Sequence, residues 1–111
     1  MEEHILLGVE RTDHTISYIS CFEKLTMAKL RDILLHSYNN LEQVVDLINY
    51  GSVLHLSKKK NENILFSTIE ESATKAELAG DKHEYLEAFD GSKAEYCLLY
   101  SGGTWNLLKV K

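Results

Sequence analysis

The sequence contains no proline and only six glycines in its 111 residues. It has neither a proline-rich stretch nor a glycine- and serine-rich run longer than a turn, so no segment has the composition of an interdomain linker. We also find no internal repeat. A chain of this length with 44% hydrophobic residues is sufficient for one core. We therefore predict a single domain over residues 1–111.

Cysteines and long apolar runs are also scarce. Cys21 and Cys97 each lie inside an apolar run without CxxC or Cys/His spacing, which favours two buried thiols over a disulfide or a metal site. The longest apolar runs span a few residues, whereas roughly 20 are needed to cross a bilayer. The acidic start Met1–His4 lacks the basic and apolar parts of a secretion signal. These absences predict a cytoplasmic protein that does not interact with membranes.

Patterns typical of catalysis and metal binding are missing. The five histidines are scattered, and none has the HxxH, HExxH or His/Cys spacing of a metal site. Ser101–Thr104 is glycine-rich but lacks the lysine and the strand-to-helix context of a phosphate loop, so it predicts a turn. Carboxylates on a solvated surface lack the desolvating pocket that a general base needs. We predict no catalytic residue, no metal, no cofactor and no enzymatic activity.

Charge is distributed unevenly along the chain. The formal net charge is −5, and the segment 62–95 holds nine acids against three bases, a local balance of −6. An acidic surface repels phosphate backbones, which disfavours direct binding of nucleic acid and favours a protein partner with a basic surface. The alternative is that these acids only keep a small protein in solution.

Local patterns predict a hairpin at each end of the chain. His4–Glu10 and Thr15–Phe22 are rich in β-prone residues and are separated by a short polar loop. The runs 94–100 and 105–110 flank a Gly-Gly turn and predict the second hairpin. In the run 94–100, apolar residues occupy both alternating positions, which predicts a central strand covered on both faces.

Between the hairpins, the apolar residues recur at helical spacing. The first predicted helix runs up to Tyr38 and has Thr26 as its N-cap residue. Asn40 caps a second helix, in which Gln43 occupies the reciprocal capping position. Gly51 supplies the left-handed residue that commonly ends a helix. The sequence therefore predicts a helical pair after the first hairpin.

The segment after Gly51 is less regular. Alanines and a capping-box pattern predict a further helix near 68–79. The segment 53–56 is compatible with a short strand or a helical end, and 81–92 with a helical turn or a loop that carries exposed aromatic residues. The predicted fold class is α+β, with a small antiparallel sheet from the N- and C-terminal hairpins packed against the helical pair.

Two groups of residues are candidates for binding. The acidic stretch and its nearby aromatic side chains form the first group, because Tyr and Trp often dominate interfaces. We expect Tyr85, Phe89 and Trp105 to be exposed, although core packing is the alternative role of aromatic residues. The second group is the only cluster of basic residues, which has the charge to hold an anion. The candidate partner-binding residues are Glu70, Glu71, Glu77, Glu84, Tyr85, Glu87, Phe89, Asp90 and Trp105, and the candidate ligand-binding residues are Lys58, Lys59 and Lys60.

One group of proteins shares several features of this sequence. Residues 34–53 read LLHSYNNLEQVVDLINYGSV, and Gly102-Gly103-Thr104-Trp105 lie near the end of the chain. In this respect the chain resembles small, mostly uncharacterised phage and prophage accessory proteins with an LLxxYN...ExVxxLIxxG helical pair and a closing GG-x-W hairpin. Members often carry an aromatic, glycine-rich segment before the first helix, whereas Cys21–Met27 contains no glycine. The resemblance implies a phage accessory protein in the bacterial cytoplasm, often a counter-defence factor, and no catalytic residues.

Three functions follow as hypotheses. The first is a non-enzymatic protein that binds and inhibits a host protein, such as a nucleic-acid-handling defence effector, by placing Glu70–Glu95 in a basic groove. The second is a small-ligand sponge that sequesters a nucleotide signal between subunits of a homo-oligomer, with Lys58–Lys60 near the phosphates and an aromatic ring near the base. The third is a structural or regulatory phage component.

Overall fold

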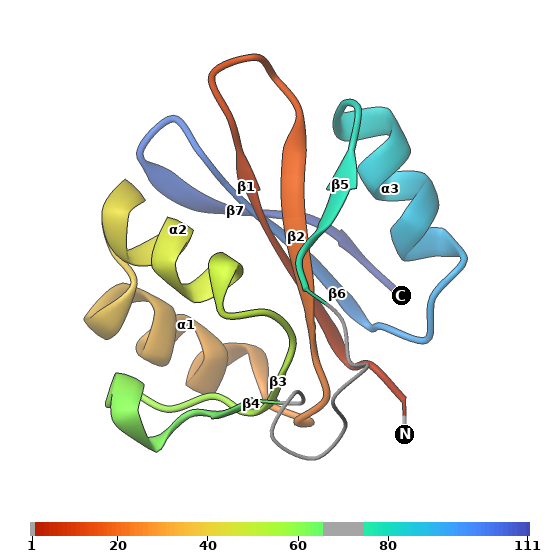
Figure 1. Cartoon of the computed structure of the whole chain (residues 1–111). Coiled ribbons are helices and arrows are strands. Elements are labelled where there is room, and N and C mark those ends of the chain that lie inside the picture. The colour runs from red at the N-terminus through yellow and green to blue at the C-terminus, as the bar shows by residue number, and fades with distance from the viewer. Residues whose placement is uncertain (1, 66–74) are drawn as a thin grey trace.

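The computed structural model describes residues 2–65 and 75–111. In this part of the chain, seven strands form one sheet with helices on both faces (Figure 1). The strands are β1 (Ile5–Glu10), β2 (Ile16–Cys21), β3 (Val53–His55), β4 (Ile64–Leu65), β5 (Glu77–Ala79), β6 (Tyr96–Ser101) and β7 (Thr104–Val110). The helices are α1 (Met27–Ser37), α2 (Leu41–Asn49) and α3 (Lys82–Asp90), with a short 3-10 turn η1 (Lys60–Glu62).

The two terminal hairpins lie side by side in the sheet and are joined through β1 and β6, and β7 forms one edge. The strand order is β4-β3-β2-β1-β6-β7, and β5 pairs with β2. Both hairpins and the α+β class are confirmed. The sheet is mixed rather than wholly antiparallel, because β1 runs parallel to β6 and β2 parallel to β3. β1 and β6 are the two most buried strands, and pairing them directly places both at the centre, where each face is covered.

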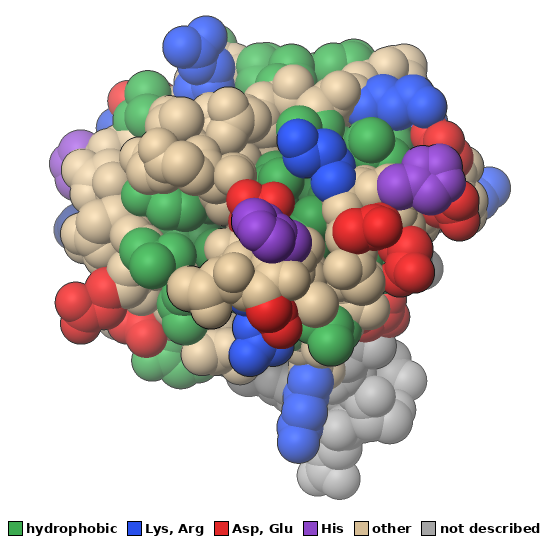
Figure 2. Space-filling model, turned by 90° about the horizontal axis from the view of Figure 1, so that it is seen from above, with side chains coloured by type: hydrophobic (Ala, Val, Ile, Leu, Met, Phe, Trp, Pro, Cys, Tyr) green, Lys and Arg blue, Asp and Glu red, His purple; other side chains and the backbone are tan. Residues whose placement is uncertain are grey.

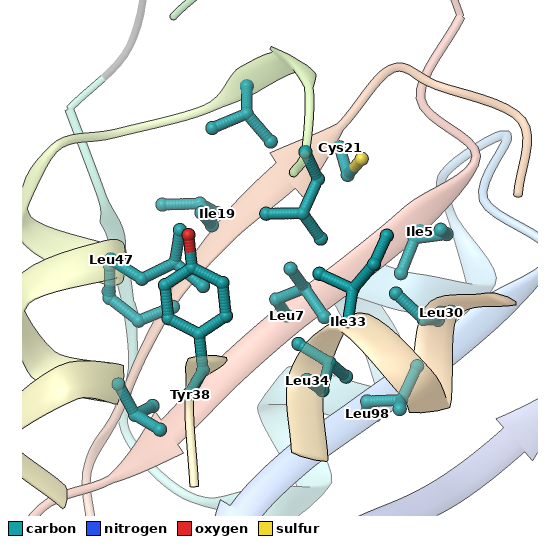
Figure 3. Close-up of a cluster of buried hydrophobic side chains, with 14 of the residues drawn as sticks. Ile5, Leu7, Ile19, Cys21, Leu30, Ile33, Leu34, Tyr38, Leu47 and Leu98 are labelled. Carbon is teal, nitrogen blue, oxygen red and sulfur yellow. The ribbon is translucent and has the colours of Figure 1, made fainter. Parts of the chain in front are cut away.

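The sheet separates two hydrophobic cores. Side chains of α1 and α2 cover one face, where residues such as Leu7, Ile19 and Leu98 from three strands meet Leu34 of α1 (Figure 3). The opposite face is covered by α3. Because side chains alternate along β6, its odd and even positions enter different cores, which confirms the predicted central strand.

The helical pair begins and ends at the predicted capping residues. The Thr26 hydroxyl accepts a hydrogen bond from the backbone N–H of Lys29 at 3.2 Å. The side chain of Asn40 accepts one from the backbone N–H of Gln43 at 2.9 Å. These bonds satisfy N–H groups that have no partner inside the helix. Gly51 has φ of 91°, a conformation that glycine adopts without a steric penalty, and it ends α2.

The helix predicted near 68–79 is wrong at its C-terminal end. Residues 77–79 form β5, which pairs antiparallel with Ile16–Tyr18, and residues 68–74 lie outside the described part of the chain. Pairing with β2 places Ala79 in the core under α3. Burial and strand pairing therefore override the helix propensity of alanine here.

The segments that the sequence left open now have definite structures. Residues 82–90, within the undecided stretch 81–92, form α3, and the Asp81 side chain caps it by accepting from the backbone N–H of Glu84 at 2.9 Å. Residues 53–55 form β3, which extends the sheet beyond β2. The helical spacing of the aromatic residues in 81–92 thus reflects a helix that packs on the sheet.

Both cysteines are free and buried, as predicted. Cys21 faces the helical pair and Cys97 faces α3, so the sheet lies between the two thiols and keeps them apart. Burial raises the pKa of Cys21 to about 12 and that of Cys97 to about 11. Both thiols therefore stay protonated and act as small apolar side chains of the core.

Candidate functional site

Exposed carboxylates gather on one side of the molecule. We call this the acidic face, and Figure 2 shows it on the right, over α3 and β5. It forms because α3 turns Tyr85 and Phe89 into the core and thereby leaves its acidic positions outward. The acidic face consists of Glu77, Asp81, Glu84, Glu87 and Asp90.

Two carboxylates of the acidic face are held by hydrogen bonds. Glu84 accepts from the backbone N–H of Gly80 at 2.8 Å, which fixes the start of α3. Glu77 accepts from the hydroxyl of Tyr18 at 2.8 Å. Burial, followed by this hydrogen bond, raises the pKa of Tyr18 to about 12. Both carboxylates are therefore held in a fixed orientation.

Two further side-chain pairs lie along α3. Nε2 of His83 lies 2.7 Å from the Glu87 carboxylate, a pair that is ionic only when the histidine is protonated. Nζ of Lys109 lies 2.8 Å from the Asp90 carboxylate. All four side chains are about half exposed or more, so solvent screens both pairs. A partner with cationic side chains can therefore compete for these carboxylates.

The predicted exposure of Tyr85 and Phe89 is wrong, because both side chains are fully buried. Their i, i+4 spacing places them on the same side of α3, and that side packs against the sheet. The Tyr85 hydroxyl donates to the backbone carbonyl of Leu98 at 2.6 Å, which satisfies its polar group inside the core. These two aromatic residues hold α3 in place and are not available to a partner.

Trp105, the third aromatic residue predicted to bind a partner, lies apart from the acidic face. Trp105 is half-buried on β7, and its indole N–H donates to the backbone carbonyl of Tyr38 at 2.8 Å. It lines a groove of about 230 Å³ between α1 and β7, on the helical-pair side of the sheet. Glu70 and Glu71 lie outside the described residues. The structure therefore brings Glu77, Glu84, Glu87 and Asp90 together and separates Trp105 from them.

The three consecutive lysines have different surroundings. Nζ of Lys58 lies 2.5 Å from the Asp32 carboxylate, and Nζ of Lys59 lies 3.9 Å from that of Glu62. Nζ of Lys60 lies 5.7 Å from the centre of the Tyr38 ring. Within the described residues, Lys60 has no carboxylate at ion-pair distance. It is therefore the lysine of the three whose charge is available to an anion.

Lys60 borders a groove of about 350 Å³ between α2 and the segment that follows β3. Sequence reasoning missed this groove. The signal in the sequence is Tyr50, an aromatic residue that lies off the apolar side of α2. In the structure its side chain is 64% exposed. An exposed aromatic residue at a helix end is a common element of binding surfaces. The groove is lined by Tyr38, Asp46, Leu47, Tyr50, Lys60, Asn61, Asn63 and Leu65.

No group of three His, Cys, Asp or Glu side chains in 2–65 and 75–111 is arranged to hold a metal ion. None of the described helices has the length and apolar character that a membrane span requires.

No protein-family model, curated protein or solved structure matches the chain. Function is therefore inferred from the side chains themselves.

Proposed function

We propose that the chain is a non-enzymatic binding protein that captures a partner with a basic surface through its acidic face and thereby inhibits it. The observation that supports this proposal is the orientation of α3. Tyr85 and Phe89 anchor α3 on the sheet. Glu84, Glu87 and Asp90 therefore project to the outside from a helix of fixed position. A helix that is already ordered presents its carboxylates to a cationic surface without the entropic cost of ordering its backbone.

The charge distribution supports the same proposal. The basic Lys58–Lys60 cluster is attached to α1 through the Lys58–Asp32 ion pair, on the side of the sheet opposite to α3. The acidic face is therefore not neutralised by that cluster. Such separation of charge orients a basic partner during encounter and raises the association rate at low salt. With Tyr85 and Phe89 in the core, charge rather than aromatic packing dominates binding, so we expect affinity to fall as salt screens it.

The resemblance to phage accessory proteins supports a setting for this activity. In that setting the chain acts in the bacterial cytoplasm, and its partner is a host protein. A defence protein that handles nucleic acid carries a basic groove for phosphate backbones, and an acidic face repeats the charge of such a backbone. We propose that the chain blocks a groove of this kind and does not itself bind nucleic acid.

Affinity capture from bacterial lysate tests the proposal. The tagged chain is compared with the charge-reversal variant Glu84→Lys/Glu87→Lys/Asp90→Lys, and we expect the partner to be lost with the variant and at high salt. A second variant, Glu84→Gln/Glu87→Gln/Asp90→Asn, removes the charges but keeps a side-chain acceptor at position 84 for the backbone N–H of Gly80. It should weaken capture while its circular dichroism stays that of the wild type.

A matched control separates the acidic face from total charge. Glu42→Lys on α2 changes the net charge by the same amount as Glu87→Lys on α3, at an exposed position on the helical-pair side of the sheet. This control variant should still capture the partner. Capture that is unchanged by the Glu84, Glu87 and Asp90 variants, or that is weakened equally by Glu87→Lys and Glu42→Lys, would contradict a role for the acidic face.

A further inference from the structure

The loop that carries Lys60 is held in place by hydrogen bonds. The side chain of Asn63 accepts from the backbone N–H of Ser57 at 2.6 Å and donates to the Tyr38 hydroxyl at 2.7 Å. The Ser37 hydroxyl donates to the backbone carbonyl of Lys58, which ties the loop to the end of α1. A loop fixed at both ends presents its remaining side chains in a defined position before any ligand arrives.

Two opposite charges line the groove next to this loop. Lys60 comes from the loop and Asp46 from the exposed side of α2. They do not form an ion pair with each other, and among the described residues neither has another ion-pair partner. The Asn61 side chain, which also lines the groove, makes no hydrogen bond within that same part of the chain. The groove therefore offers one cation, one anion and one amide to a ligand.

The rest of the groove is apolar and aromatic. Leu47 and Leu65 line it, and the Tyr38 ring lies beside Leu47 (Figure 3). Tyr50 is 64% exposed, so its ring is accessible to a planar group. The volume of about 350 Å³ is in the range of small-molecule sites. A matching ligand is small and planar, with an anionic group at one end and hydrogen-bond donors at the other.

We propose that this groove binds a guanine nucleotide. The base stacks on Tyr50, its N1–H and 2-amino group donate to the Asp46 carboxylate, and the phosphate lies at Lys60. Adenine presents no such pair of donors on one edge, so a carboxylate at this position discriminates between the two purines. The site belongs to one chain and needs no subunit interface. A chain that holds a nucleotide without transforming it acts as a small-ligand sponge.

Calorimetric titration with GMP, AMP, guanosine and inorganic phosphate tests this site. GMP should bind at least about tenfold more tightly than AMP, because the unpaired Asp46 carboxylate disfavours adenine. Guanosine and phosphate alone should bind more weakly than GMP. Tyr50→Ala, Asp46→Asn and Lys60→Gln should each weaken GMP binding by about tenfold, the effect of one lost charge-assisted bond or one lost stacking contact.

Matched controls keep the test decisive. Lys59→Gln removes a neighbouring lysine that pairs with Glu62 and does not line the groove, so it should bind GMP as the wild type does. The substituted groove side chains Tyr50, Asp46 and Lys60 are exposed, and unchanged amide NMR spectra away from the groove would verify the fold. Failure to bind GMP, equal affinity for GMP and AMP, or equal affinity for GMP and inorganic phosphate would overturn the proposal.

The proposal of a nucleotide site in the groove and the proposal of partner binding at the acidic face can be tested independently. The groove lies on the helical-pair side of the sheet and α3 on the other. The Glu84→Gln/Glu87→Gln/Asp90→Asn variant should therefore bind GMP with wild-type affinity. Loss of GMP binding in that variant would contradict the assignment of the ligand to this groove.

Discussion

The two faces of the sheet differ in how firmly they hold their helices. Among the described residues, 17 buried side chains form the core under α1 and α2, whereas 8 form the core under α3. The attachment of α3 to the smaller core depends mainly on the rings of Tyr85 and Phe89, because these are the two buried side chains of the helix. The acidic face therefore stands on a helix with two buried side chains, whereas the groove is built on the larger core.

Truncating Phe89 should weaken the attachment of α3 more than any other change considered. Phe89→Ala leaves a cavity under α3, and we expect it to lower the free energy of unfolding by about 3–5 kcal/mol. Because few other side chains hold the helix, α3 should open locally before the rest unfolds. Chemical denaturation measures the total, and amide hydrogen exchange measures the local opening. Equal loss of protection in α1 and α3 would contradict a separately attached α3.

Gly8 gives the next largest effect, because β1 passes closely under the Tyr85 ring. A Cβ atom at Gly8 would lie 2.9 Å from Cζ of Tyr85 and 3.1 Å from Cγ2 of Ile16. We expect Gly8→Ala to cost about 1–3 kcal/mol of stability through overpacking. The double variant with Tyr85→Leu removes the ring, so the two costs should be less than additive. Additive costs in denaturation would show that Tyr85 is not the residue that requires glycine.

The smallest effect concerns pH. The pKa of Tyr18 is raised to about 12, from an ordinary value of about 10. The folded state therefore favours the neutral phenol, and its stabilising contribution is complete below pH ~10 and lost as pH rises toward ~12. Tyr18→Phe cannot ionise, so its stability should fall less between these pH values. Denaturation at both pH values checks this, and an identical fall in both proteins would exclude Tyr18 as a contributor.

Much of the fold could be predicted because its signals are local. Thr26 and Asn40 cap helices within three residues of themselves, and the Gly-Gly turn forms a hairpin from adjacent strands. β5 escaped prediction because three residues carry little periodicity and pair with Ile16–Tyr18, far away in the sequence. The parallel pairing of β1 with β6 is likewise non-local. Such contacts depend on the whole chain rather than on neighbouring residues.

The binding surfaces were less predictable than the fold. Acidic composition correctly marked the side of α3 as charged but gave the wrong orientation for Tyr85 and Phe89, whose i, i+4 spacing already indicated a shared buried side. The groove escaped notice because Lys60 and Tyr50 come from different elements, and only the hydrogen-bonded loop brings them together. Sequence spacing carries no information about such a meeting.

The claim that α3 is the surface that contacts the partner can be tested directly by site-specific photocrosslinking. A photoreactive side chain is placed at Glu87 on α3 or at Glu42 on α2, both exposed, and the protein is irradiated in bacterial lysate. The account predicts one covalent product of defined mass from position 87, lost at high salt, and none from position 42. A product from position 42 alone, or from neither position, would contradict it.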